Sequence, residues 1–247
     1  MRKLIAIVIF GALVYGLYHY GLIGFKEEPF SYHYFDDFET LNREFWYAGE
    51  WETFFPAYDK VIMEDGSVNL TVNQTNRGPF LLTEPIEIRE GSIVHIRRKA
   101  LVHYGNENFT GGFALLQTND DDLRPEVLND NGGSGLGKGL ALIEYVHNYN
   151  EDSTRPGRDI FRFMMPNWEE QKNYELIDPI FDEWFTEELT YNTENGIITY
   201  QINDEIHTLR GFSLKENYIR VFMHSYGRNT GHSMKMEYFE VEVKAIN

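Results

Sequence analysis

The chain has 247 residues, of which 42% are hydrophobic and 15% aromatic, and it carries 22 Lys and Arg against 39 Asp and Glu. A chain this rich in aromatic residues can bury a core, which excludes intrinsic disorder. The absence of cysteine excludes a disulfide scaffold and any thiolate zinc site. The net charge of −17 argues against a nucleic-acid partner, because phosphates require a basic surface.

Residues Leu4–Phe25 form an apolar run without Asp, Glu, Lys or Arg. A helix needs about 20 such residues to cross the hydrocarbon core, so the run predicts one N-terminal transmembrane helix within residues 1–25. Arg2 and Lys3 precede the run, and the positive-inside rule then places the N-terminus in the cytoplasm. We therefore expect a single-pass protein of the cell membrane with an extracytoplasmic C-terminal domain.

A cleaved signal peptide is the alternative reading of this segment. The apolar region of a signal peptide spans about 7–15 residues and ends in a small-residue A-x-A-like site. The run here is longer, and Gly21–Lys26 contains no such site, which favours an uncleaved anchor. Cleavage would make the domain secreted. In both cases a short linker at residues 26–31 leads to one domain outside the cytoplasm.

From Tyr32 onward, hydrophobic and polar residues alternate in short runs, which is typical of β-strands. The clearest runs are Ser92–His103, Ile197–Ile202, Tyr218–Tyr226 and Met234–Val243. Turn signals are Asp65–Gly66, Gly111–Gly112, Asn195–Gly196 and Asn203–Asp204. The last of these predicts a two-residue hairpin loop. We predict one all-β domain over residues 32–247, a two-sheet antiparallel β-sandwich of the jelly-roll type.

Thr118–Lys138 is the longest irregular stretch of this domain, and loops of that length are usually functional or disordered. Asp120–Asp122 and Asn129–Asn131 offer oxygen ligands without the spacing of an EF-hand. Gly132–Lys138 approaches a P-loop, but Gly139 stands where a Ser or Thr should bind magnesium. The loop therefore predicts no nucleotide partner.

The order of several motifs resembles the concanavalin A-like lectin/glucanase superfamily. The motifs are Tyr34–Phe38 followed by Leu41 and Trp46, then Trp51, Asp65–Leu70, Gly111–Leu116, Tyr200–Ile206, His224–Gly227 and Met236–Val241. This resemblance covers about 215 residues and is one of fold. It implies a two-sheet jelly roll with one concave face that meets carbohydrate in many relatives.

The sequence departs from the catalytic members of that superfamily. Glucanases of this type carry an E-x-D-x-x-E strand, and this motif is absent from the chain. The nearest strand, Ala141–His147, holds one carboxylate, Glu144, whereas a retaining glycosidase needs two about 5 Å apart. We therefore expect a non-catalytic module that binds carbohydrate or another cell-surface ligand. A glycoside hydrolase or polysaccharide lyase with a non-standard acid/base set is the alternative.

Tyr218–Tyr226 is the strand with the most informative pattern. One face carries Ile219, Val221 and Met223 and is predicted to face the core. The other face carries Tyr218, Arg220, Phe222, His224 and Tyr226. Rings can stack on the apolar faces of sugars while donors bind hydroxyls, so this face is a predicted ligand site. Alternatively, a long loop covers the face and Arg220 pairs with an acid, which would make the domain a protein-interaction module.

Glu144 lies in a strand that is apolar on both faces, so its carboxylate needs a partner. Arg97, Arg162 and Arg220 are the candidates, and a structural ion pair is favoured over a ligand role. All three arginines and Glu144 are kept in the predicted ligand-binding set. The resemblance also implies a structural Ca²⁺ between the first and last strands, with Glu237 and Asp37 in the similar positions.

Overall fold

The computed structural model describes residues 30–50, 56–73, 78–104, 109–118, 139–149, 157–164, 174–227 and 230–246. Contacts divide the chain into Met1–Phe30 and Ser31–Asn247, and all the described strands lie in the second unit. The predicted transmembrane helix lies outside the described residues. Within them, no helix has the length and the apolar character needed to cross a bilayer.

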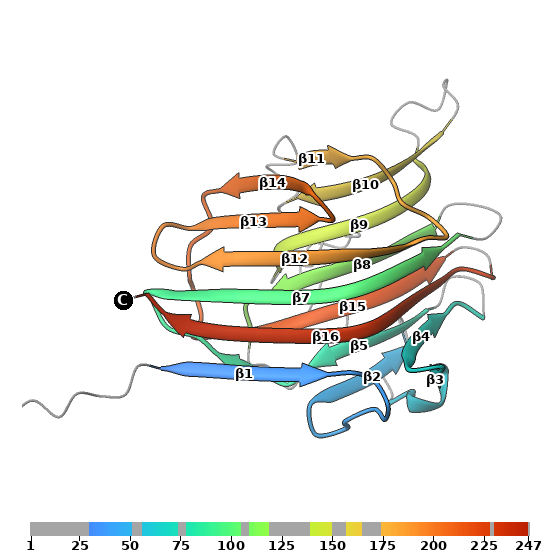
Figure 1. Ribbon diagram of the computed structural model, residues 1–247, viewed down its shortest axis with the longest axis horizontal. Coiled ribbons are helices and arrows are strands. Elements are labelled where there is room, and N and C mark those ends of the chain that lie inside the picture. The colour runs from blue at the N-terminus through green and yellow to red at the C-terminus, as the bar shows by residue number, and fades with distance from the viewer. Residues whose placement is uncertain are drawn as a thin grey trace, which may run out of the picture. The chain divides into compact units, whose positions relative to one another are not determined.

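The second unit is a sandwich of two antiparallel sheets, each with eight strands (Figure 1). Sheet A has the spatial order β14–β13–β12–β7–β16–β4–β3, and β1 also pairs with β16. Its strands are β1 (Ser31–Asp36), β3 (Val61–Glu64), β4 (Ser67–Thr71), β7 (Ser92–His103), β12 (Trp184–Asn192), β13 (Ile197–Ile202), β14 (Glu205–Arg210) and β16 (Ser233–Ala245). The predicted all-β sandwich is confirmed.

Sheet B has the spatial order β11–β10–β9–β8–β15–β5–β2, and β6 pairs with β15. Its strands are β2 (Trp46–Glu50), β5 (Pro79–Thr83), β6 (Ile86–Glu87), β8 (Phe109–Leu116), β9 (Gly139–Tyr149), β10 (Arg158–Met164), β11 (Tyr174–Ile177) and β15 (Tyr218–Gly227). A single turn of 3-10 helix, η1 (Tyr58–Lys60), precedes β3.

Tight turns connect the hairpins of sheet A where the sequence predicts them. Asp65 and Gly66 join β3 to β4 with φ values of 52° and 68°, the left-handed conformation that a two-residue hairpin loop needs. Asn203 joins β13 to β14 with a φ of 48°, and its Oδ1 accepts a hydrogen bond from the Thr186 N–H at 3.1 Å. The turn predicted at Gly111–Gly112 is wrong, because both glycines lie within β8.

Alternation along each strand sorts its residues into the core or onto an outer face. In β7, Val94 and Ile96 are buried, whereas Arg97 is exposed. In β15, Met223 pairs directly with Phe113 of β8, and both side chains are buried. Directly paired residues share a face of the sheet. The predicted core face of β15 is therefore confirmed.

The first predicted motif is held by one buried carboxylate, that of Asp36. Its Oδ2 accepts hydrogen bonds from Trp46 Nε1 at 2.9 Å and from Tyr34 Oη at 2.7 Å. Its Oδ1 accepts from the Phe38 N–H at 2.8 Å. Three donors thus satisfy a carboxylate that is only 7% exposed, and they fix the turn that leads from β1 toward β2.

Candidate functional site

One row of residues crosses the outer face of sheet B. The row consists of directly paired residues from β10, β9, β8, β15 and β5, namely Arg162, Glu144, Gly112, His224 and Phe80, and we call it the Glu144 row. It lies on the outer face because the neighbouring residues Tyr145 and Phe113 point inward, toward Arg98 of sheet A.

An ion pair forms the polar part of the row. Arg162 Nε donates to Glu144 Oε2 at 3.0 Å, and Arg162 Nη2 contacts the same oxygen. Glu144 is buried, while the Arg162 side chain is 17% exposed. Leu176 pairs with Arg162 at the edge of the sheet and is 38% exposed. Solvent therefore reaches the row from its β10–β11 end.

Two glycines leave room for the rings of the row. A Cβ atom on Gly112 would lie 2.6 Å from the Ile143 carbonyl oxygen and 2.9 Å from His224 Cε1. A Cβ atom on Gly49, which pairs with Phe80, would lie 2.3 Å from Phe80 Cζ. Any larger residue would collide at either position. The imidazole and the phenyl ring therefore lie across the backbones of the neighbouring strands.

A cluster of apolar residues, which we call the apolar floor, adjoins the row on the same face. Its buried members are Phe80, Leu82, Ala114, Leu116, Leu142, Met164 and Phe222, and Tyr47 packs against them. The Phe222 ring stacks on His224 with centroids 5.0 Å apart and lies 5.1 Å from the Phe80 ring. Sheet B thus buries side chains on both faces, and the polar groups of the row lie next to buried apolar side chains.

His224 is neutral in this environment. Its burial, and then the positive charge of Arg98, lower the pKa of His224 from 6.5 to about 3. Near neutral pH its imidazole therefore carries one N–H donor and one nitrogen acceptor. The row combines this neutral ring with a carboxylate and a guanidinium, a set that can bind hydroxyl groups.

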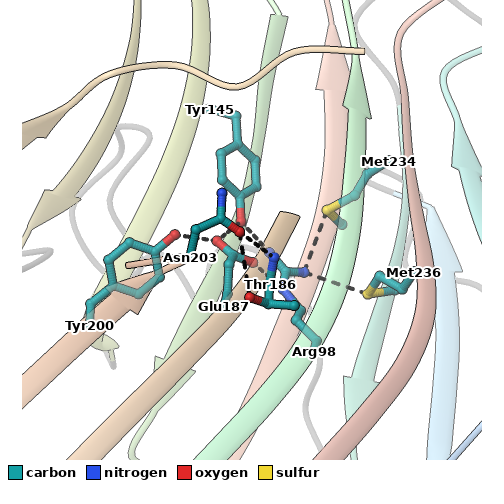
Figure 2. A network of polar contacts seen from close by, with 8 residues as sticks. All are labelled: Arg98, Tyr145, Thr186, Glu187, Tyr200, Asn203, Met234 and Met236. Carbon is teal, nitrogen blue, oxygen red and sulfur yellow. Dashed lines mark hydrogen bonds and ion pairs between the residues drawn. The ribbon is translucent and has the colours of Figure 1, made fainter. Parts of the chain in front are cut away.

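A buried charged network lies in the core between the two sheets (Figure 2). Arg98 of β7 donates from Nε to Glu187 Oε2 of β12 at 2.5 Å, and both side chains are fully buried. Tyr145 Oη donates to Glu187 Oε1 at 2.5 Å, and Tyr200 Oη contacts the same oxygen. Arg98 also lies 3.5 Å from the sulfur atoms of Met234 and Met236. Tyr145 comes from sheet B, so the network connects the two sheets.

This network was not predicted from the sequence, although a signal was present. Arg98 shares its alternation phase with Val94 and Ile96, which predicts an inward side chain. Burial and the Glu187 carboxylate raise the pKa of the Tyr200 hydroxyl well above its ordinary value. Because its members are closed to solvent, the network supports the structure rather than binding a ligand.

The structure brings together most of the predicted ligand residues. Glu144, Arg162, Arg220 and His224 share the outer face of sheet B, and the ion pair expected for Glu144 is present, with Arg162 as its partner. Arg220 is buried, and its Nε donates to the Thr83 carbonyl at 2.7 Å. Their ligand-binding role stays a prediction.

The other three predicted residues have separate outcomes. Tyr218 is half-buried at the start of β15, where it pairs with Glu87 of β6. The side chain of Tyr226 and most of the Thr118–Lys138 loop lie outside the described residues. The expectation that Arg97 neighbours Glu144 is wrong. Arg97 lies on the outer face of sheet A, 2.9 Å from Glu240 Oε2, because β7 pairs with β16 and β12 rather than with β9.

Glu237 and Asp37, the residues predicted to bind calcium, both have partners within the part of the chain that the structure describes. Glu237 pairs with Lys99, and Asp37 Oδ1 accepts the Glu39 N–H at 3.2 Å. A calcium ion takes six to eight oxygen ligands. The described residues hold no cluster of three or more acidic or histidine side chains suited to a metal. Calcium binding by Glu237 and Asp37 therefore stays a prediction.

Comparison with solved structures gives the fold a wider context. The seed lectin of Lotus tetragonolobus aligns with a TM-score of 0.62 and 10% identity, covering 88% of this chain and 99% of the lectin. An endo-1,3-beta-glucanase from Streptomyces sioyaensis aligns with a TM-score of 0.58 and 10% identity over 86% and 95% of the two chains. The CBM2 module of the evolved Dit protein of Lactobacillus casei BL23 phage J-1 aligns with a TM-score of 0.57 and 13% identity over 90% and 99%.

These similarities establish a concanavalin A-like jelly roll, as the resemblance in sequence implied. At such low identity they concern the fold alone. No protein-family profile and no curated protein sequence matches the chain.

Proposed function

We propose that the domain binds carbohydrate through the Glu144 row of sheet B. The single observation that carries the proposal is the Arg162–Glu144 ion pair beside neutral His224, set against an apolar floor. Paired charges and a neutral imidazole offer donors and acceptors in fixed positions, and sugar hydroxyls need both. Phe222 and Phe80 are buried beside His224 and hold its ring in place. The lectins among the similar structures support this reading.

A glycan array with two matched double variants tests the proposal. Glu144→Gln with Arg162→Gln removes both charges of the row together and leaves no buried charge without a partner. Glu242→Gln with Lys244→Gln neutralises a pair on β16 whose atoms are 2.6 Å apart, and it serves as the control. We expect the first variant to lose glycan binding and the second to keep it. Unchanged binding by the first variant would exclude the row.

Catalysis on a polysaccharide is the second candidate, since a glucanase shares the fold. Glu144 alone carries a carboxylate among the residues of the row, so a pair of carboxylates does not operate there. A hydrolase or lyase would instead use Glu144 with the neutral imidazole of His224 as base. Release of reducing or unsaturated ends from a polysaccharide panel, abolished in Glu144→Gln, would establish this candidate over simple binding.

We further propose that residues 4–25 anchor the domain to the cell membrane, with the N-terminus in the cytoplasm. The apolar run after Arg2 and Lys3 supports this orientation. Resistance of the membrane-bound protein to alkaline extraction, together with a mature mass that includes the run, is the expected result. A mature chain that begins after residue 25 would show a cleaved signal peptide and a secreted domain.

A further inference from the structure

The outer face of sheet A carries an aromatic stripe that the proposed function does not use. The stripe consists of one residue from each of four neighbouring strands, β1, β16, β7 and β12, namely Phe35, Tyr238, Lys99 and Trp184. These strands lie side by side in Figure 1. Phe35 is 53% exposed and Trp184 is 39% exposed, which is unusual for large apolar side chains.

Contacts connect the stripe from end to end. The Phe35 and Tyr238 rings stack with centroids 6.2 Å apart and planes 24° from parallel. Tyr238 pairs directly with Lys99 across the β16–β7 ladder, so both project from the same face. Lys99 Nζ lies 5.3 Å from the centroid of the Trp184 ring. The stripe crosses three strand spacings, which amounts to about 14 Å.

A bulge in β16 builds the centre of the stripe. The pairing register shifts between Met236 and Tyr238, so Glu237 and Tyr238 both project outward between the buried Met236 and Phe239. Without the bulge, one of the two would point into the core. Bulges commonly redirect side chains at functional positions, and this one places a ring and a carboxylate next to Lys99.

The charges around the stripe are paired within the chain. Glu237 pairs with Lys99, and Glu240 contacts Arg97 and His33 at 2.9 Å each. In a chain with a net charge of −17, this neutralised surface favours an uncharged partner over an anionic one. The cores of protein–protein interfaces are depleted of Lys and Glu, whereas here both residues flank the rings.

We propose that the aromatic stripe is a second binding surface, for a neutral polysaccharide chain. A sugar ring has an apolar face that matches Phe35, Tyr238 and Trp184, and its hydroxyl groups match the fixed charges beside them. The stripe lies on the opposite sheet from the Glu144 row. One domain would therefore contact two polysaccharide segments, and linked sites of this kind raise avidity beyond the affinity of either site.

Affinity electrophoresis of the full chain tests the stripe, with a mild detergent present because residues 4–25 are apolar. The native gels contain a β-1,3-glucan, a β-1,4-glucan, a galactomannan or an α-mannan. Every variant is made in the background Glu144→Gln with Arg162→Gln, which isolates the stripe from the proposed row. Phe35→Ala with Trp184→Ala should weaken the affinity for the polysaccharide that retards the chain, as measured from the retardation, about tenfold or more. Ile206→Ala, a change at a 63% exposed residue on the edge strand β14, should leave it unchanged.

The conservative variant Trp184→Phe keeps a ring at this position, so it should retain most of the retardation that Phe35→Ala with Trp184→Ala loses. This comparison distinguishes a loss of stacking from misfolding. Retardation in none of the four gels, or retardation that Phe35→Ala with Trp184→Ala leaves intact, would overturn the stripe. Retardation of the unsubstituted chain that is lost on introducing Glu144→Gln with Arg162→Gln, before any change in the stripe, would overturn it too, while supporting the row. Sedimentation measures whether the chain is a monomer or a dimer. If the chain is a dimer, if Phe35→Ala with Trp184→Ala converts it to a monomer, and if the polysaccharide has no effect, the proposal would be overturned. The partner of the stripe would then be a second copy of the chain.

Discussion

Replacement of Glu187 by glutamine is expected to destabilise the domain strongly. The substitution keeps the shape of the side chain and removes the charge that faces Arg98 in the core. Both side chains have an exposed fraction of zero, so no water can solvate the guanidinium once its counter-charge is gone. Removal of one partner from a buried ion pair costs about 3–5 kcal/mol in the free energy of unfolding.

The hydroxyls around Glu187 add to that loss. Tyr145 and Tyr200 both donate to Glu187 Oε1, whereas Arg98 donates to Oε2, and a glutamine can present its one acceptor oxygen to only one of these two sides. A buried hydroxyl left without its acceptor costs about 1–3 kcal/mol. Since domains of this kind have a total stability of about 5–15 kcal/mol, Glu187→Gln should bring the chain close to its folding limit.

A double-mutant cycle measured by urea denaturation checks this reasoning. Arg98→Met and Glu187→Leu should each be severely destabilising, and their combination should cost much less than the sum, because the double variant buries no lone charge. Adding Tyr145→Phe and Tyr200→Phe to the double variant should recover further stability, since it removes the orphaned hydroxyls. Additive single effects, or a loss below about 1 kcal/mol for Glu187→Gln, would refute the assignment of the network as a coupled unit.

Three further outcomes are expected from other parts of the structure. His224 has a folded pKa of about 3 against an ordinary 6.5, so the unfolded chain binds more protons between these values. The free energy of unfolding should therefore fall with decreasing pH in this window, by up to about 1.4 kcal/mol per unit, and His224→Gln should remove that slope. Gly49→Ala should lower the melting temperature, because its Cβ atom would collide with the Phe80 ring. The added change Phe80→Leu should recover part of this loss, and the absence of any recovery would exclude the collision as its cause. Asp36→Asn should cost about 1–3 kcal/mol, measured by chemical denaturation, because the one amide oxygen can accept either from Trp46 and Tyr34 or from the Phe38 N–H, but not from both sides. A neutral effect would contradict the role given to Asp36.

Local pattern was sufficient to predict several of the strands and the two faces of β15. Alternation placed Val221 and Met223 in the core and His224 on the outer face, and the Asp65–Gly66 and Asn203–Asp204 turns lie where their residue types favour them. The rule that glycine pairs mark turns fails at Gly111–Gly112, because glycine in a strand can also allow close packing. There the structure shows the reason, since the His224 ring occupies the space above Gly112.

Pairing between distant strands could not be read from local pattern. Arg97 and Arg162 have similar surroundings in the sequence, yet only Arg162 reaches Glu144, because β10 pairs with β9 and β7 belongs to the other sheet. Which strands become neighbours depends on contacts between segments far apart in the chain, and a single sequence gives no periodic signal for these. For the same reason the partners of Arg98 were not foreseen: Glu187 lies 89 residues further along the chain.

The position of β16 within sheet A has a consequence for biosynthesis. β16 follows the other described strands of the sandwich in the chain, and it pairs with β7 along one edge and with β1 and β4 along the other. Until Ser233–Ala245 has been made, sheet A therefore consists of three separate parts, namely β14–β13–β12–β7, β4–β3 and β1 alone, all with unpaired edges. Domains otherwise begin to fold as the chain emerges.

A nascent chain of this design cannot complete sheet A before β16 has been made. Premature termination anywhere before Ser233 would remove the middle of the sheet rather than its margin, so truncated products should be cleared by proteases instead of accumulating as partly active fragments.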